Sequence, residues 1–246
     1  MNFTRFLAVV AAVTMFSSVA SADITNAGAM PATNVLYGQD TGNIGTRLID
    51  EDVSSNHARG SFFTLAANAT GYNINTISLE SNGGNNNFVG TTASLSLFIF
   101  QGTQADFDAG TGHSTGTDGG NYYVDTTVTP LVQQTKTIGL DFSTAGDWLS
   151  FTLTNPLMVG ATGGDFGFFF VYEQGDSNND DFDHREGNDQ GAATFNRSSI
   201  TTTDHSTSGS RALNFVVQGE AKPVPEPSAM ILLGLGAVGF ASRRRR

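Results

Sequence analysis

The chain of 246 residues contains no cysteine. Disulfide bonds, thiol nucleophiles and thiolate metal sites are therefore excluded, and the fold must be held together by packing, with bound ions as a further aid. Tryptophan occurs once and tyrosine five times, whereas phenylalanine occurs 19 times. The aromatic side chains are thus mainly of the type that packs in a core without a polar group to present.

Basic residues are also scarce. Between residues 23 and 222 there are seven Lys and Arg against 22 Asp and Glu, so 7 − 22 gives a formal charge of −15. Binding to nucleic acid requires a basic surface for the phosphates, so this charge argues against nucleic acid as a partner. An acidic surface instead keeps an exported protein soluble and attracts divalent cations.

The C-terminus lacks a full membrane span. Its apolar run, Ala229 to Ala241, has thirteen residues, against the ~20 that cross a bilayer core comfortably. Four arginines, Arg243, Arg244, Arg245 and Arg246, follow the run and should stay on the cytoplasmic side of the membrane. The strip before the run is Val224, Pro225, Glu226 and Pro227, in which the prolines favour an extended, accessible backbone. These features predict a marginal anchor that leaves most of the chain outside.

This order of parts resembles the PEP-CTERM sorting signal of Gram-negative bacteria, over residues 223–246. The resemblance implies recognition by an exosortase, a membrane-embedded cysteine protease or transpeptidase that cleaves near the Pro-Glu-Pro element. It also implies a short hydrophobic helix held transiently in the inner membrane. A cell that makes exopolysaccharide, and a protein released, attached to the surface or built into the extracellular matrix, are further implications.

The N-terminus has the three parts of a secretory signal peptide. Arg5 supplies the positive region, residues 6–16 supply the apolar region, and Ala20-Ser21-Ala22 is an A-x-A cleavage site for signal peptidase. We therefore divide the chain into a signal peptide at 1–22, a body at 23–222 and a sorting signal at 223–246.

The body is predicted to be all-β, an antiparallel β-sandwich that is jelly-roll-like in its number of strands. Alternating apolar and polar residues predict strands at 73–81, 92–101, 135–143, 147–154, 165–173 and 211–220, and weaker patterns predict strands at 60–66, 122–126 and 192–198. Pro156 and the glycine-rich stretch 160–164 predict a turn, and the nearly all-apolar run 165–173 predicts a central strand. The hairpin that begins at Trp148 also resembles a segment of many secreted bacterial jelly-roll domains.

Two polar stretches, 109–121 and 174–191, are predicted to be long loops. The second begins like an EF-hand loop, but Asp181 stands where glycine is needed and Gly187 stands where the bidentate glutamate is needed. A calcium site of another type is one hypothesis, and a solvated charged loop is the alternative. The candidate Ca²⁺ ligands are Asp176, Asn178, Asp180, Asp181, Asp183 and Glu186.

Carbohydrate binding by ring stacking has three candidate residues, Trp148, Tyr122 and Tyr123, although a single tryptophan at the start of an apolar strand more often packs in the core. No catalytic residues are assigned. Asp141, Asp147 and Asp165 lie at expected strand ends, where acids usually cap turns, and there is no G-x-S-x-G motif.

The sequence thus predicts an exported, non-enzymatic surface or extracellular-matrix protein that is processed by an exosortase and associated with exopolysaccharide or biofilm. A carbohydrate-binding module is the first alternative and a glycan-active enzyme the second. The expected partners are signal peptidase, the exosortase and exopolysaccharide, with transient association with the inner membrane and no nucleic acid.

We expect Asp23 to be the N-terminal residue of the exported protein, because Ala20 and Ala22 fit the small pockets of signal peptidase. N-terminal sequencing of the protein recovered from outside the inner membrane tests this expectation. Retention of Met1 on that protein would contradict it.

Overall fold

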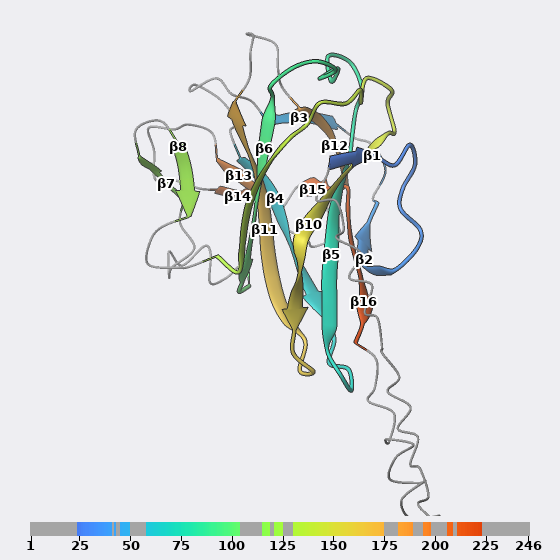
Figure 1. Ribbon diagram of the computed structural model, residues 1–246, viewed down its shortest axis with the longest axis vertical. Helices are drawn as coiled ribbons and strands as arrows, with labels where there is room; N and C mark the ends of the chain where they lie inside the picture. Colours follow the sequence, from blue (N-terminus) through green and yellow to red (C-terminus); the bar gives the residue numbers. More distant parts are fainter. Residues whose placement is uncertain are drawn as a thin grey trace, which may run out of the picture.

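The computed structural model describes residues 24–40, 42, 45–49, 58–103, 115–118, 121–124, 130–174, 182–188, 194–197, 206–208 and 211–222. The helices and strands in these ranges are all of one kind: the ranges contain β-strands and no helix (Figure 1). The predicted signal peptide, the predicted sorting signal and residues 175–181 and 189–191 lie beyond the described residues.

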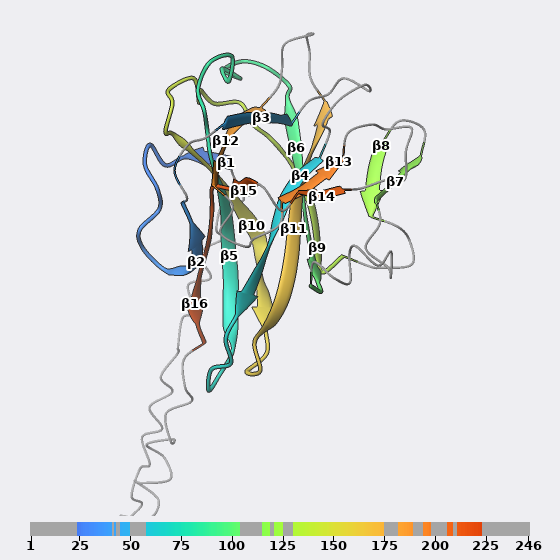
Figure 2. The same ribbon diagram turned by 180° about the vertical axis from the view of Figure 1, so that it is seen from behind.

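The strands form two principal antiparallel sheets that face each other, a smaller sheet and a separate hairpin (Figures 1 and 2). In order across each sheet, the first contains β1 (Ile24–Asn26), β10 (Trp148–Val159), β5 (Tyr72–Glu80), β16 (Phe215–Ala221) and β2 (Val35–Gln39). The second contains β14 (Ser206–Ser208), β13 (Thr194–Arg197), β4 (Ala58–Leu65), β11 (Gly164–Gln174), β6 (Ser94–Gln101) and β9 (Val132–Thr137). The small sheet contains β15 (Arg211–Leu213), β12 (Phe182–Asn188) and β3 (Gly45–Ile49), and the hairpin contains β7 (Thr115–Asp118) and β8 (Asn121–Val124).

The pairing between the main strands is nested along the chain. β6 pairs with β9, β5 with β10, and β4 with β11. The outermost pair joins β2 to β16. The first and last long strands of the body are therefore neighbours, and successive pairs in this nest fall alternately in the second and the first sheet.

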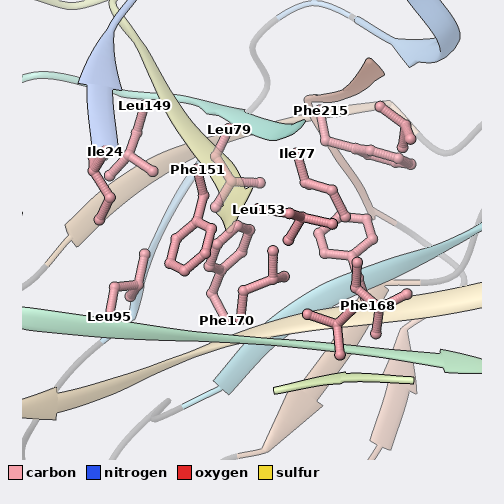
Figure 3. Close-up of a cluster of buried hydrophobic side chains, with 14 of the residues drawn as sticks. Ile24, Ile77, Leu79, Leu95, Leu149, Phe151, Leu153, Phe168, Phe170 and Phe215 are labelled. Carbon is pink, nitrogen blue, oxygen red and sulfur yellow. The ribbon is translucent and has the colours of Figure 1, made fainter. Parts of the chain in front are cut away.

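The core lies between the two principal sheets and is built from large apolar side chains (Figure 3). Phe168 on β11 lies 4.8 Å, between ring centroids, from Phe215 on β16 of the opposite sheet, and Phe170 lies 5.9 Å from Phe151 on β10. All four rings are completely buried. Burial of one such side chain contributes about 1.5–3 kcal/mol to the free energy of unfolding, so these contacts are a main reason why the sheets stay together.

The outer face of the second sheet is buried as well, over β6 and β11. Phe98 and Phe169 stack with centroids 4.8 Å apart, and each is only 1% exposed. Phe100 packs beside them. This arrangement confirms that residues 165–173 form a central strand that is apolar on both faces, since β11 lies between β4 and β6.

Two predicted strands have different limits in the structure. The strand predicted at 135–143 ends at Thr137, and Gly139 has a φ of 59°, which breaks the extended backbone. Ile138 and Phe142 are nevertheless buried, so their apolar pattern came from core packing by irregular chain. The strand predicted at 211–220 is two strands in different sheets, separated at Asn214.

Two boundary predictions were also wrong. β10 does not end before Pro156 but continues to Val159, with a shift in its register against β5 between Thr152 and Leu157. A proline without a backbone donor is tolerated at such an irregularity. In addition, part of the predicted loop 174–191 is strand β12, whose acidic and amide residues concealed its alternation of buried and partly exposed positions.

The β4–β5 turn (66–71) and the β10–β11 turn (160–163) form the lower tip of the sandwich, where β16 also ends (Figure 2). The two turns touch through their backbones, since the N–H of Asn68 donates to the carbonyl of Ala161 at 2.8 Å. Gly71 and Gly163 have φ values of 84° and 68°. A Cβ atom at either glycine would lie 2.1 Å from a backbone oxygen of the opposite hairpin, so the close approach requires glycine.

We expect Gly71→Ala and Gly163→Ala each to lower the free energy of unfolding by about 2–4 kcal/mol, because each adds a backbone clash to an unfavourable positive φ. Gly160→Ala is the matched control, since its Cβ would meet nothing within 4 Å. Urea denaturation of the three variants measures the difference. Equal stability of Gly71→Ala and Gly160→Ala would contradict the packing described for the two turns.

Candidate functional site

A buried polar network occupies the upper end of the sandwich, where β5 meets the small sheet. Glu80, at the end of β5, accepts hydrogen bonds from Arg185 Nη1 at 2.6 Å and from Asn214 Nδ2 at 2.7 Å. The Asn214 amide also donates to the carbonyl of Gly42 at 2.9 Å. Because each side chain is bonded to another element, this network joins β5, β12 and the β15–β16 junction.

Asparagine side chains hold β12 against the loop that follows β5. Asn86 is buried, and its amide bonds both backbone groups of Asp183, donating to the carbonyl and accepting from the N–H at 2.8 Å each. Asn82 Nδ2 donates to Asp183 Oδ2 at 3.1 Å. The asparagine-rich run 82–87 therefore helps to join the chain after β5 to β12. Its side-chain amides take the place of the backbone hydrogen bonds that would pair two strands. No feature of the sequence pointed to this role.

The calcium candidates are only partly described. Asp183 and Glu186 both lie on β12, three positions apart, so their side chains leave opposite faces of the strand. Within the described residues, no group of three or more His, Cys, Asp or Glu side chains is arranged to hold a metal ion. Asp176, Asn178, Asp180 and Asp181 lie outside those residues, and the calcium site stays a prediction for them.

The carbohydrate candidates are also only partly described. Trp148 begins β10 and is only 2% exposed, so its ring has no free face on which a sugar could stack. The hypothesis is therefore wrong for this residue, because core packing takes its surface. Tyr122 and Tyr123 lie on β8 at the edge of the molecule in Figure 1, and their side chains are not among those described.

The three acids considered for catalysis have structural partners. Asp141 accepts a hydrogen bond from the N–H of Ser143 at 2.8 Å, a turn cap. Asp147 accepts one from Asn26 Nδ2 at 2.7 Å, which ties β1 to the chain before β10. Asp165 accepts one from the Thr64 hydroxyl at 2.6 Å across the β4–β11 pair.

The lower end of the sandwich fixes the last described residue. The N–H of Lys222 donates to the carbonyl of Gly71 at 2.9 Å, and the Lys222 carbonyl accepts a hydrogen bond from the Thr70 hydroxyl. Lys222 Nζ reaches the other hairpin and donates to the carbonyl of Val159, the last residue of β10, at 3.2 Å. We call this set of three hydrogen bonds the Lys222 clamp. It bonds the residue after β16 to the β4–β5 turn and to the end of β10.

Asn68 gives the first of these turns its shape. Its Oδ1 accepts from the N–H groups of Thr70 and Gly71, and its Nδ2 donates to the carbonyl of Gly71 at 3.0 Å. Asparagine is favoured in such positions because its side chain can replace a backbone partner. The clamp is therefore built on a turn that is itself internally bonded.

The residues directly after the clamp match a protein-family model. Residues 223–246 match the PEP-CTERM protein-sorting motif. The chain carries a PEP-CTERM sorting signal. This match confirms the resemblance drawn from Pro225, Glu226, Pro227 and the terminal arginines, and the PEP-CTERM signal begins at the residue after Lys222.

The PEP-CTERM signal implies an extracellular protein that is exported, anchored transiently in the membrane and processed by an exosortase. Comparison of the chain with curated proteins and with solved structures found no match. The described part of the chain contains no helix with the length and apolarity needed to span a bilayer.

Of the features at this end, the signal can be recognised from the sequence, but the clamp cannot. Thr70 and Asn68 are small polar residues in an ordinary turn, and nothing in their spacing points to a residue 152 positions later. The only indication in the sequence was the presence of Gly71 and Gly163, because glycine predicts a turn but does not indicate which residues the turn contacts.

Asp183 provides a test of the network at the upper end. Burial raises the pKa of its carboxyl group above the ordinary value of 3.8, and the hydrogen bond from Asn82 only partly opposes this effect. The folded state therefore binds the proton more tightly than the unfolded state, so the free energy of unfolding falls as the pH rises from the unfolded to the folded pKa. We expect Asp183→Asn to remove this fall, as measured by urea denaturation at a series of pH values.

Asp141→Asn is the matched control, because hydrogen bonds from Ser143 lower the pKa of Asp141. Its contribution has the opposite sign: it is present above the unfolded pKa and is lost as the pH falls through the folded pKa. An Asp183→Asn protein with the same pH dependence as the wild type would show that Asp183 is not desolvated in solution.

Proposed function

We propose that this chain is a non-enzymatic surface or extracellular-matrix protein, associated with exopolysaccharide, whose C-terminal signal is read and removed by an exosortase. The observation that supports it most directly is the junction at Lys222. The described part of the sandwich ends in the clamp, and the match to the sorting motif begins at the next residue. This supports a body and a signal that adjoin without overlap.

A structural role for the body is supported by the use of its polar groups. Glu80, Arg185 and Asn214 bond one another, and the acids of the predicted strand ends cap turns or join strands. These contacts use the charged groups of Glu80, Arg185, Asp141, Asp147 and Asp165 to hold the fold. The bulk of the body would act through its shape and its acidic surface.

We also infer that the body is a jelly roll. The four nested pairs, β2 with β16, β4 with β11, β5 with β10 and β6 with β9, are those of one long hairpin. Rolling such a hairpin places successive pairs in alternate sheets, and two of them fall in each principal sheet here. This inference supports a scaffold that carries loops at both ends.

The proposed role of the signal is tested by Glu226→Ala in the full chain, in the cells that produce it. Glu226 is the one charged side chain between Lys222 and the apolar run, so its loss should block cleavage and leave an uncut, membrane-associated precursor. Ile231→Leu is the control. Its apolar run is as apolar as the original and should hold the membrane equally well, so this variant should be processed normally. Fractionation and mass spectrometry of the C-terminus give the readout. Normal processing of Glu226→Ala would contradict the proposal.

A further inference from the structure

The Lys222 clamp limits how far the sorting motif can lie from the folded body. Three peptide units separate Lys222 from Pro225, and an extended chain covers at most about 11 Å over that distance. Residues 223, 225 and 227 are prolines with fixed φ, which reduces the conformations available to this strip. Chain length alone therefore keeps Pro225 within about 11 Å of Lys222 while β16 is folded.

An enzyme that binds the Pro225-Glu226-Pro227 strip is larger than the distance from Lys222 to Pro225. Even a domain of 100 residues has a radius of gyration of about 13 Å, so its surface extends past the bound peptide on every side. The part of the body next to Lys222 must then meet the enzyme, and the clamp determines that this part is the pair of turns 66–71 and 160–163.

The surface of these turns suits such an approach. Residues 66–71 are Ala-Ala-Asn-Ala-Thr-Gly and residues 160–163 are Gly-Ala-Thr-Gly, so neither turn carries a charged side chain. Ala67, Ala69, Ala161 and Thr162 are exposed. The body around them has a formal charge of −15, so its uncharged tip can approach another macromolecule without desolvating a carboxylate.

Given the proposed processing by an exosortase, on which this inference rests, we infer that the tip formed by the β4–β5 and β10–β11 turns is the surface that lies against the exosortase during cleavage. The clamp fixes the point at which the chain leaves the body, directly beside these turns. It places the uncharged turns at the face of the enzyme.

The inference is tested by placing charge on the tip. The double substitution Ala67→Glu with Thr162→Glu should slow processing about tenfold in a pulse-chase experiment, because two carboxylates would have to be desolvated at the contact. The control is Val89→Glu with Thr144→Glu, two exposed positions in loops at the opposite end, which should be processed at the wild-type rate. Thermal melting of the purified proteins checks that all variants are folded.

Two further variants identify the partner and the role of distance. Ala67→Lys with Thr162→Lys should slow processing as well if the tip meets a closely packed protein surface. Lysines that leave the rate unchanged or raise it would indicate contact with anionic lipid instead and would overturn the inference. Insertion of eight Gly and Ser residues between Lys222 and Pro223 adds an r.m.s. length of about 16 Å and should restore processing of the glutamate variant.

The outcomes separate this inference from the proposed function. Wild-type rates for the glutamate variant, or no rescue by the insertion, would overturn docking through the tip while leaving the sorting role intact. Normal processing of Glu226→Ala would instead remove the proposed function itself.

Discussion

The two principal sheets are joined by aromatic packing centred on Phe168. Its ring contacts Phe63 and Phe170 on its own sheet and Phe215 on the opposite sheet. In a chain without cysteine, this packing takes the place that covalent cross-links hold in many exported proteins. Both ends of the molecule depend on it, because β16 carries Phe215 at one end and leads to Lys222 at the other.

The two ends of the sandwich are held by different means. At the upper end, carboxylate, guanidinium and amide side chains join three separate elements around Glu80 and Asn86. At the lower end, the contacts are largely between backbone groups of two tight turns and the end of β16. The upper end therefore relies on several ionisable side chains, whereas the lower end relies on backbone groups and one such side chain, the Lys222 ammonium.

The sequence was a good guide where burial followed a simple period. The strands at β5, β6, β10 and β11 were predicted because their apolar residues alternate or run continuously, and the structure confirms these strands. β12 was missed because Asp183, Arg185 and Glu186 are the residue types of a surface loop, yet Asn82 and Glu80 provide partners for the first two. The edge strands β1 and β2 were missed because three and five residues are too few for a period to show.

The features of the candidate site also differ in whether the sequence could predict them. The sorting signal could be recognised because its parts are contiguous and each has a direct physical role. The Lys222 clamp could not, because Thr70, Val159 and Lys222 meet only through the fold. Trp148 was a candidate for sugar binding by its residue type alone, and its burial agrees with the alternative given for it, a tryptophan that packs at the start of an apolar strand.

The position of β16 has a consequence for how the protein is made. This strand is the last of the body, yet it lies inside its sheet between β5 and β2, and Phe215, Val216 and Val217 are fully buried. The N-terminal part of the chain is synthesised first, so the first sheet stays incomplete until nearly the whole body has been made. The long sequence separation of pairs such as β2 with β16 also makes late, slow assembly the expected course.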